Sequence, residues 1–202
     1  MSGKRTVQLT DPRALRALAH PVRMDLMGLL RRGGPLTATQ AGEEIGESAA
    51  SCSFHLRQLA KYGLVEEAGG GRGRERPWRA TAISTEWAAR GSDEETDAAG
   101  TLLSRVVIER YLQNAIEWLE RRGSEDSQWV EAAMLNDALI YMTVEELRQL
   151  DEKIRALLEP YLQRLEKSEP PAEGARPVNV IALAFPLPPS RGGDDDSLFR
   201  YA

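Results

Sequence analysis

The sequence predicts a mainly α-helical fold with a small amount of β structure, divided into two parts of opposite charge. Apolar residues recur at helical spacing, and capping residues mark where helices begin. Two short helices joined by a tight turn are predicted within residues 37–63, a helix-turn-helix arrangement. Residues 1–91 carry 14 Lys or Arg and 9 Asp or Glu, which gives a net charge of +5. Residues 92–202 carry 12 Lys or Arg and 22 Asp or Glu, which gives a net charge of −10. A basic module for nucleic acid and an acidic module with another role are therefore expected.

Composition restricts the class of protein. A chain of 202 residues with 42% hydrophobic and 28% charged residues is typical of a soluble globular protein. No apolar run approaches the roughly 18 residues of a membrane helix, and the first residues have no signal-peptide pattern. The single cysteine excludes an internal disulfide. We expect a cytoplasmic protein with no membrane partner.

The basic module begins with two helices. Asp11 followed by Pro12 predicts the first, because an aspartate caps the helix and proline suits its first position. Pro21 begins the second, which ends at Gly33.

The helix-turn-helix follows. Thr37 and Gln40 match a capping box, and Gly46 ends that short helix. Ser48 caps the next helix, which covers residues 48–62 and ends at Gly63.

The two faces of this second helix differ in chemistry. Its predicted core face carries Cys52, His55, Leu56 and Leu59, at i, i+3, i+4 and i+7. Small residues near its start allow close approach to DNA, and serine and arginine side chains bond to phosphates or base edges. The predicted DNA-facing residues are Ser48, Ala50, Ser51, Ser53, Phe54, Arg57 and Lys61.

A β-hairpin is predicted after this helix. One strand begins at residues 64–65, and residues 76–82 return antiparallel to it. The glycine-rich tip, residues 69–76, carries Arg72, Arg74 and Arg76, which suit the DNA backbone or minor groove. Trp78 is interpreted as the anchor of the hairpin.

Residues 11–81, about a third of the chain, resemble the ArsR-type winged helix-turn-helix regulators. The matching segments are residues 18–30 (LAHPVRMDLMGLL), 51–59 (SCSFHLRQL) and 63–66 (GLVE). The resemblance implies a homodimeric transcriptional regulator whose paired recognition helices enter successive major grooves of an operator. The metal-sensing branch has a Cys-x-Cys site before the recognition helix, but residues 37–46 contain no cysteine. A non-metal-sensing regulator is expected, with no metal and no cofactor.

Two residues of the recognition helix leave alternatives open. Phe54 either touches a thymine methyl group or packs against its own protein. Cys52 and His55 are spaced as two metal ligands, but two are too few, and we interpret both as core residues. The alternative for Cys52 is redox control of DNA binding, which requires exposure and a lowered thiol pKa.

The acidic half is predicted to be helical. Residues 91–100 are interpreted as an acidic linker or a helix lead-in. Amphipathic helices are expected over residues 102–122 and from Thr143, in a capping box with Glu146, to Lys167. Residues 129–141 form a short helix or include a strand at 138–142, and the β-prone residues 178–185 pair with that strand or with a second subunit.

Residues 101–185 are therefore predicted to form a dimerisation domain that also senses a small-molecule effector, with a disordered tail at 186–202. An apolar pocket is the hypothesis for the effector, with core packing as the alternative. The candidate lining residues are Trp118, Trp129, Met134, Tyr141 and Tyr161.

The sequence thus predicts a sequence-specific regulator of double-stranded DNA, a homodimeric repressor with a DNA-binding domain at residues 10–90. The alternatives are a winged helix used for protein interaction, and the redox regulator. No catalytic constellation is present in the sequence, so an enzyme is not expected.

Overall fold

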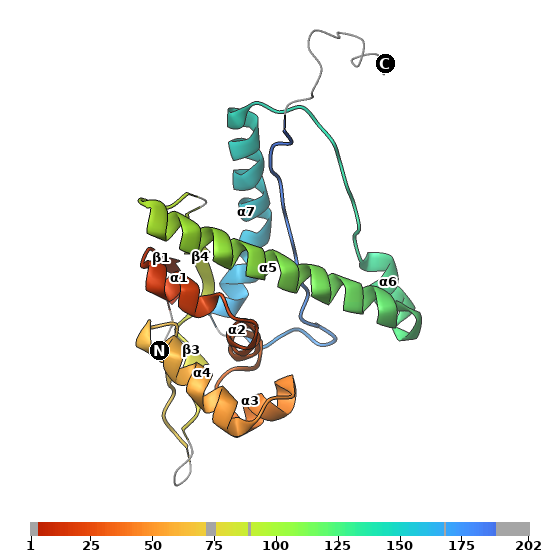
Figure 1. The fold of residues 1–202 in the computed structure, drawn as a ribbon. Coiled ribbons are helices and arrows are strands. Elements are labelled where there is room, and N and C mark those ends of the chain that lie inside the picture. Colours follow the sequence, from red (N-terminus) through yellow and green to blue (C-terminus); the bar gives the residue numbers. More distant parts are fainter. Residues whose placement is uncertain (1–3, 72–75, 89, 168, 189–202) are drawn as a thin grey trace.

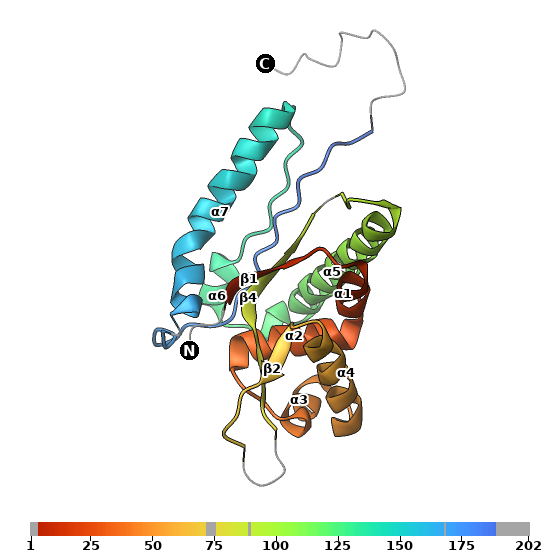
Figure 2. The same ribbon diagram turned by 90° about the vertical axis from the view of Figure 1, so that its left-hand side faces the viewer.

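The structure is a computed structural model that describes residues 4–71, 76–88, 90–167 and 169–188 (Figure 1). A helical N-terminal domain carries two small sheets, and a long helix, α5, crosses it and leads into an extended C-terminal half (Figures 1 and 2). The helices of the N-terminal domain are α1 (Pro12–Leu18), α2 (Pro21–Gly33), α3 (Ala38–Ile45) and α4 (Ala49–Lys61). The predicted fold class, a winged helix-turn-helix domain followed by a helical region, is confirmed.

The predicted helix starts are also confirmed. The Asp11 carboxylate accepts a hydrogen bond from the Arg13 amide at 2.8 Å and caps α1. Pro21 occupies the first turn of α2. These local signals act within one helical turn, which explains why the sequence alone reveals them.

Two two-stranded sheets complete this domain. Strands β2 (Val65–Glu67) and β3 (Trp78–Ala80) pair antiparallel, as the hairpin prediction requires. The second sheet was not predicted: β1 (Lys4–Leu9) pairs in parallel with β4 (Ala82–Trp87). Most of the N-terminal domain lies between these two strands along the chain. No turn pattern in the sequence therefore indicates that they pair.

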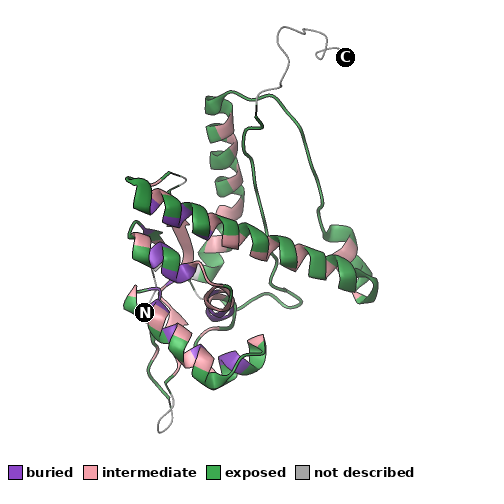
Figure 3. Ribbon diagram, in the orientation of Figure 1, coloured by how far each residue is buried: buried purple, intermediate pink, exposed green. Residues whose placement is uncertain are grey.

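The hydrophobic core lies between α1, α2, α4 and the hairpin. Its fully buried side chains include Leu26, Leu56 and Leu59, each with 0% exposure. The start of α5 (Glu94–Arg121) closes this core from outside, with Ala99 and Leu103 buried against α1. Leu103 is the last buried residue of the described chain (Figure 3).

The beginning of α5 corrects the linker interpretation of residues 91–100. Asp93 caps the helix by accepting from the Thr96 amide at 2.8 Å, so residues 94–100 are its first turns. Glu94, Glu95 and Asp97 lie in the first turn, where the helix dipole favours negative charge. The acidic run therefore starts a helix, as the lead-in alternative required.

The C-terminal half is less regular than predicted. A 3-10 turn, η1 (Arg122–Ser124), is followed by the short helix α6 (Ser127–Ala132) and then by α7 (Val144–Glu166). The capping box of Thr143 and Glu146 is confirmed at the start of α7. The predicted strands are not formed: residues 138–142 and 178–185 have no regular secondary structure. A strand needs a neighbouring strand to satisfy its backbone groups, and neither described segment takes part in one of the two sheets. Of the predicted tail, residues 189–202 lie outside the described residues.

Candidate nucleic-acid interface

The turn between α3 and α4 orients the two helices of the motif. The Thr37 hydroxyl accepts from the Gln40 amide at 3.2 Å, and the Gln40 side chain accepts from the Thr37 amide at 2.9 Å, completing the predicted capping box. Gly46 ends α3 with φ of 72°, a left-handed conformation that glycine adopts without strain. The Ser48 hydroxyl then accepts from the Ser51 amide at 3.1 Å and caps α4.

A second glycine, which sequence reasoning missed, makes this turn tight. A Cβ atom on Gly42 would lie 2.5 Å from the Glu47 carbonyl oxygen. Only glycine therefore allows α3 to approach the turn this closely. Its role depends on a contact five residues away, and no capping pattern signals it.

The predicted core face of α4 is confirmed. Cys52, Leu56 and Leu59 are fully buried, and His55 is half-buried. The predicted DNA-facing side is open to solvent in most positions. Ser48, Ala50, Phe54, Arg57 and Lys61 are exposed, and Ser51 and Ser53 are half-buried.

Phe54 lies mainly in solvent. Its side chain is 51% exposed, and its ring meets the His55 ring edge-on with centroids 5.2 Å apart. About half of the side chain is thus open to solvent, where a thymine methyl group could reach it.

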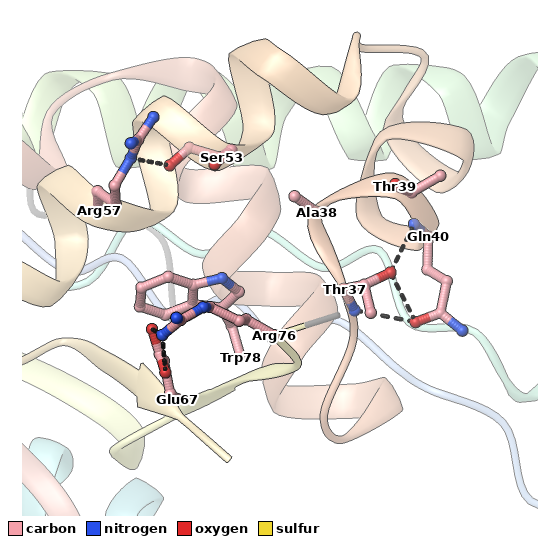
Figure 4. Close-up of a pocket in the computed structure, with 9 residues that line it drawn as sticks. All are labelled: Thr37, Ala38, Thr39, Gln40, Ser53, Arg57, Glu67, Arg76 and Trp78. Atoms are coloured by element: carbon pink, nitrogen blue, oxygen red, sulfur yellow. Dashed lines mark hydrogen bonds and ion pairs between the residues drawn. The ribbon is translucent and has the colours of Figure 1, made fainter. Parts of the chain in front are cut away.

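An open groove lies between α3, α4 and the hairpin (Figure 4). Ser53 and Arg57 line it from α4, and the Arg57 Nε donates to the Ser53 carbonyl at 3.1 Å. The groove also has a wall that was not predicted, made by residues at the start of α3. The additional lining residues are Thr37, Ala38, Thr39, Gln40, Glu67, Arg76 and Trp78.

The hairpin base forms the other side of the groove. The Arg76 guanidinium donates to both carboxylate oxygens of Glu67, at 3.1 and 3.0 Å (Figure 4). Trp78 is 9% exposed and exchanges backbone hydrogen bonds of 2.8 and 3.0 Å with Leu36. Its predicted role as the hairpin anchor is confirmed. Arg72 and Arg74 lie outside the described residues.

A cluster beneath α4 joins residues that are distant in sequence. The imidazole rings of His20 and His55 have centroids 4.6 Å apart. The Nδ1 atoms of both rings and the Nε of Arg23 are buried without a hydrogen-bond partner in the described chain. Burial lowers the pKa of both imidazoles, and the Arg23 charge lowers it further, while Glu47 opposes the shift. For His55, the neighbouring His20 also lowers the pKa.

This cluster predicts acid sensitivity of folding. The folded-state pKa of each histidine lies below its unfolded value of about 6.5, so the unfolded chain binds more protons in mildly acidic solution. Stability is therefore complete above about pH 6.5 and falls as pH decreases toward the folded pKa values. Urea denaturation at pH 7.5 and 5.5 measures the loss. A His55→Gln variant should lose less stability between the two pH values; an equal loss would assign the effect to other groups.

Cys52 lacks the exposure and the lowered thiol pKa of a redox-sensing cysteine. Its side chain is fully buried, and burial raises the thiol pKa, with the Glu47 charge acting in the same direction. A reactive thiol requires exposure and a lowered pKa. The structure therefore disfavours the redox alternative. No three His, Cys, Asp or Glu side chains of the described residues group as a metal site.

The candidate pocket residues lie on four separate elements. Trp118 is on α5, Trp129 on α6, Met134 and Tyr141 on the segment before α7, and Tyr161 on α7. Met134, Tyr141 and Tyr161 are 79%, 83% and 61% exposed. The Arg176 guanidinium lies 5.0 Å from the centre of the Trp129 ring.

Comparison with known proteins bears on the N-terminal domain. A family model described as a helix-turn-helix domain matches residues 18–68, which contain α2, α3, α4 and β2. No curated protein matches the chain. Within the described residues, no helix has both the length and the apolar character to cross a membrane. The geometry of α3 and α4 and this match together show that the chain carries a helix-turn-helix domain, the structural unit of DNA-binding regulators.

Proposed function

We propose that this protein is a sequence-specific regulator of double-stranded DNA that acts as a homodimeric repressor of the ArsR type. The exposed face of α4 carries this proposal. Its inner face is buried in the core, whereas its outer face presents serine, arginine and lysine beside an open groove. Such a helix is held rigidly and offers donors to base edges and phosphates.

Each part of the interface has a separate task in this proposal. Arg57, in the middle of α4, reads base edges in the major groove. Lys61, at the end of α4, and the hairpin arginines neutralise phosphates. A homodimer places its two recognition helices about 34 Å apart, which matches one turn of DNA. A small-molecule effector acting on the C-terminal half would change this spacing.

Binding-site selection from genomic DNA with the purified protein tests the proposal. The expected result is a repeated half-site with a spacing close to one helical turn. Affinity for the selected site should decrease as salt increases. An absence of salt-dependent affinity near 100 mM salt would contradict DNA binding and support a protein-interaction module.

Two substitutions should separate phosphate contact from base reading. Arg74→Ala is expected to weaken binding to every sequence and to reduce the salt slope by about one unit, since one phosphate contact is lost. Arg57→Ala is expected to reduce preference for the selected site by about 1–3 kcal/mol. Fluorescence anisotropy against matched and scrambled sites measures both quantities.

Arg148→Ala is the control for these variants. Arg148 is an exposed arginine on α7 that pairs with Glu145 at 3.6 Å, far along the chain from α4. Its loss should leave both the salt slope and the preference unchanged. A uniform loss of affinity in Arg57→Ala would argue against base reading, and an unchanged slope in Arg74→Ala would remove the hairpin from the interface.

A further inference from the structure

The C-terminal half exposes apolar surface that its own chain does not cover. Among the described residues 22 large apolar side chains are exposed, and all except Phe54 lie from Leu102 to Leu187. No described residue after Leu103 is buried (Figure 3). Exposed apolar side chains in such number, without a buried core of their own, are typical of a surface that a partner covers.

Two extended segments contribute much of this surface. We call residues 177–187 the C-terminal arm and residues 133–143, which connect α6 to α7, the receiving segment; both are extended chain without regular secondary structure (Figures 1 and 2). The arm contains no charged residue, and the receiving segment contains one, Asp137, in a protein of which 28% is charged. Such composition is typical of buried chain rather than of solvated loops.

The arm has the pattern of a strand that is covered on both sides. In an extended chain alternate side chains point to opposite faces. Val178 and Val180 then share one face, 65% and 55% exposed, and Leu183 and Phe185 share the other, 57% and 70% exposed. Its backbone groups form no hydrogen bond with the described chain. Apolar side chains on both faces and an unpaired backbone require a neighbouring strand and two covering layers.

Two helices supply further uncovered surface. The exposed large apolar side chains of α5 lie within an arc of about 120° at 100° per residue. They are Leu102, Ile108, Leu112, Ile116 and Leu119. On α7 the exposed stripe is Leu157, Tyr161 and Leu165, at successive four-residue steps. Each of these stripes could pack against a second helix or cover a strand.

The total exposed apolar area of the C-terminal half is large enough for a dimer interface. A half-exposed large side chain presents roughly 100 Å², so the exposed apolar residues of this half present on the order of 2,000 Å². A stable interface of standard size needs about 800 Å² from each partner, and obligate homodimers use more, with a higher apolar fraction. A second copy brings an equal, equally apolar surface, as a twofold interface requires.

We propose that the C-terminal arm of one chain docks as a β-strand on the receiving segment of a second copy, and that the second copy returns the same contact. The reciprocal exchange pairs the backbone of both segments and covers both apolar faces of each arm. The α5 and α7 stripes form the layers above and below. This proposal rests on the homodimer of the proposed function and identifies the segments that hold it together.

Mixed cysteine variants test the exchange in the full-length chain. On a Cys52→Ser background, one chain carries Leu183→Cys and a differently tagged chain carries Ile140→Cys. After mixing and mild oxidation, we expect a disulfide that joins the two differently tagged chains. In a single chain with both cysteines, a disulfide that forms only within the chain would show that the arm folds back on itself, and would overturn the proposal.

Charge in the arm supplies an independent measurement. Val180→Asp with Leu183→Asp places a carboxylate on each face, and burying unpaired charge is expected to raise the dimer dissociation constant at least about 100-fold. Sedimentation measures this constant. Ala172→Asp, in the exposed chain between α7 and the arm, is the control and should leave it unchanged.

The outcomes separate this proposal from the proposed function. A dimer that forms no interchain disulfide and tolerates both arm carboxylates overturns the exchange, while the DNA-binding homodimer stands. A monomeric parent protein overturns the exchange and the homodimer together. A monomeric protein that still binds DNA would support the helix-turn-helix as a DNA-binding surface, without the homodimer or the exchange.

Discussion

Leu56→Ala is expected to reduce the free energy of unfolding by about 2–5 kcal/mol. Leu56 lies at the centre of the buried face of α4 and has 0% exposure. The substitution removes buried apolar atoms and leaves a cavity between α4 and its neighbouring helices. A domain whose total stability is about 5–15 kcal/mol loses a large fraction of it, and the recognition helix loses the support that orients it.

The neighbouring residue provides the control. Arg57→Ala changes an exposed side chain of the same helix, so its effect on unfolding should stay within about 0.5 kcal/mol while its effect on DNA preference is large. Urea denaturation and DNA titration, applied to both variants, should therefore give opposite rankings. A loss below about 1 kcal/mol in Leu56→Ala would show that α4 does not pack on the core as described.

Local signals explain why much of the DNA-binding domain could be predicted. The caps of α3 and α4 each depend on a few neighbouring residues. Thr37 and Gln40 cap the start of α3, Gly46 ends it, and Ser48 caps the start of α4, all as predicted. The face of α4 that carries Leu56 follows from helical spacing alone. These interactions need no knowledge of distant parts of the chain.

Features that depend on distant contacts could not be predicted. Strand β1 pairs with β4, and Thr6 hydrogen-bonds to Ser84 at 2.7 Å across 78 positions in the sequence. The ring contact between His20 and His55 is equally non-local. His20 and His55 are far apart in the sequence, but the start of α2 lies against α4 and brings their rings together.

Strand propensity did not lead to a paired strand within one chain in the C-terminal half. Residues 178–185 are rich in valine, isoleucine and leucine, which favour strands. Propensity describes what a segment does when a partner is present, and a lone strand is not stable in water. The extended, unpaired arm is thus consistent with its sequence and with the need for a second chain.

Leu112→Asp combined with Ile116→Asp is expected to lower the apparent affinity for the selected operator by about 10²–10⁴-fold. Both side chains lie on the exposed stripe of α5, 59% and 40% exposed, so the charges should weaken the dimer and leave the fold of one chain intact. A dimer binds two half-sites with the second contact made at high effective concentration, and a monomer loses this gain.

Helix α5 is rigidly joined to the N-terminal domain, so in the proposed homodimer the pairing of α5 would set the position of both recognition helices. The Arg110 guanidinium donates to the Asp25 carboxylate on α2 at 2.9 Å, and its side chain is 19% exposed. The Trp87 indole of β4 donates to the Ser104 hydroxyl at 2.9 Å. With Leu103 buried against α1, these contacts leave α5 little freedom to tilt alone.

For the variant with Leu112→Asp and Ile116→Asp, sedimentation measures dimerisation and DNA titration measures operator affinity on the same protein samples. Gln113→Asp is the control, because Gln113 lies beside the stripe on an exposed, polar part of α5 and the substitution adds one carboxylate where the double variant adds two. It should leave the dimer and the affinity nearly unchanged, which separates lost dimerisation from simple repulsion of DNA. A variant that becomes monomeric yet keeps full operator affinity would show that one helix-turn-helix domain suffices for binding.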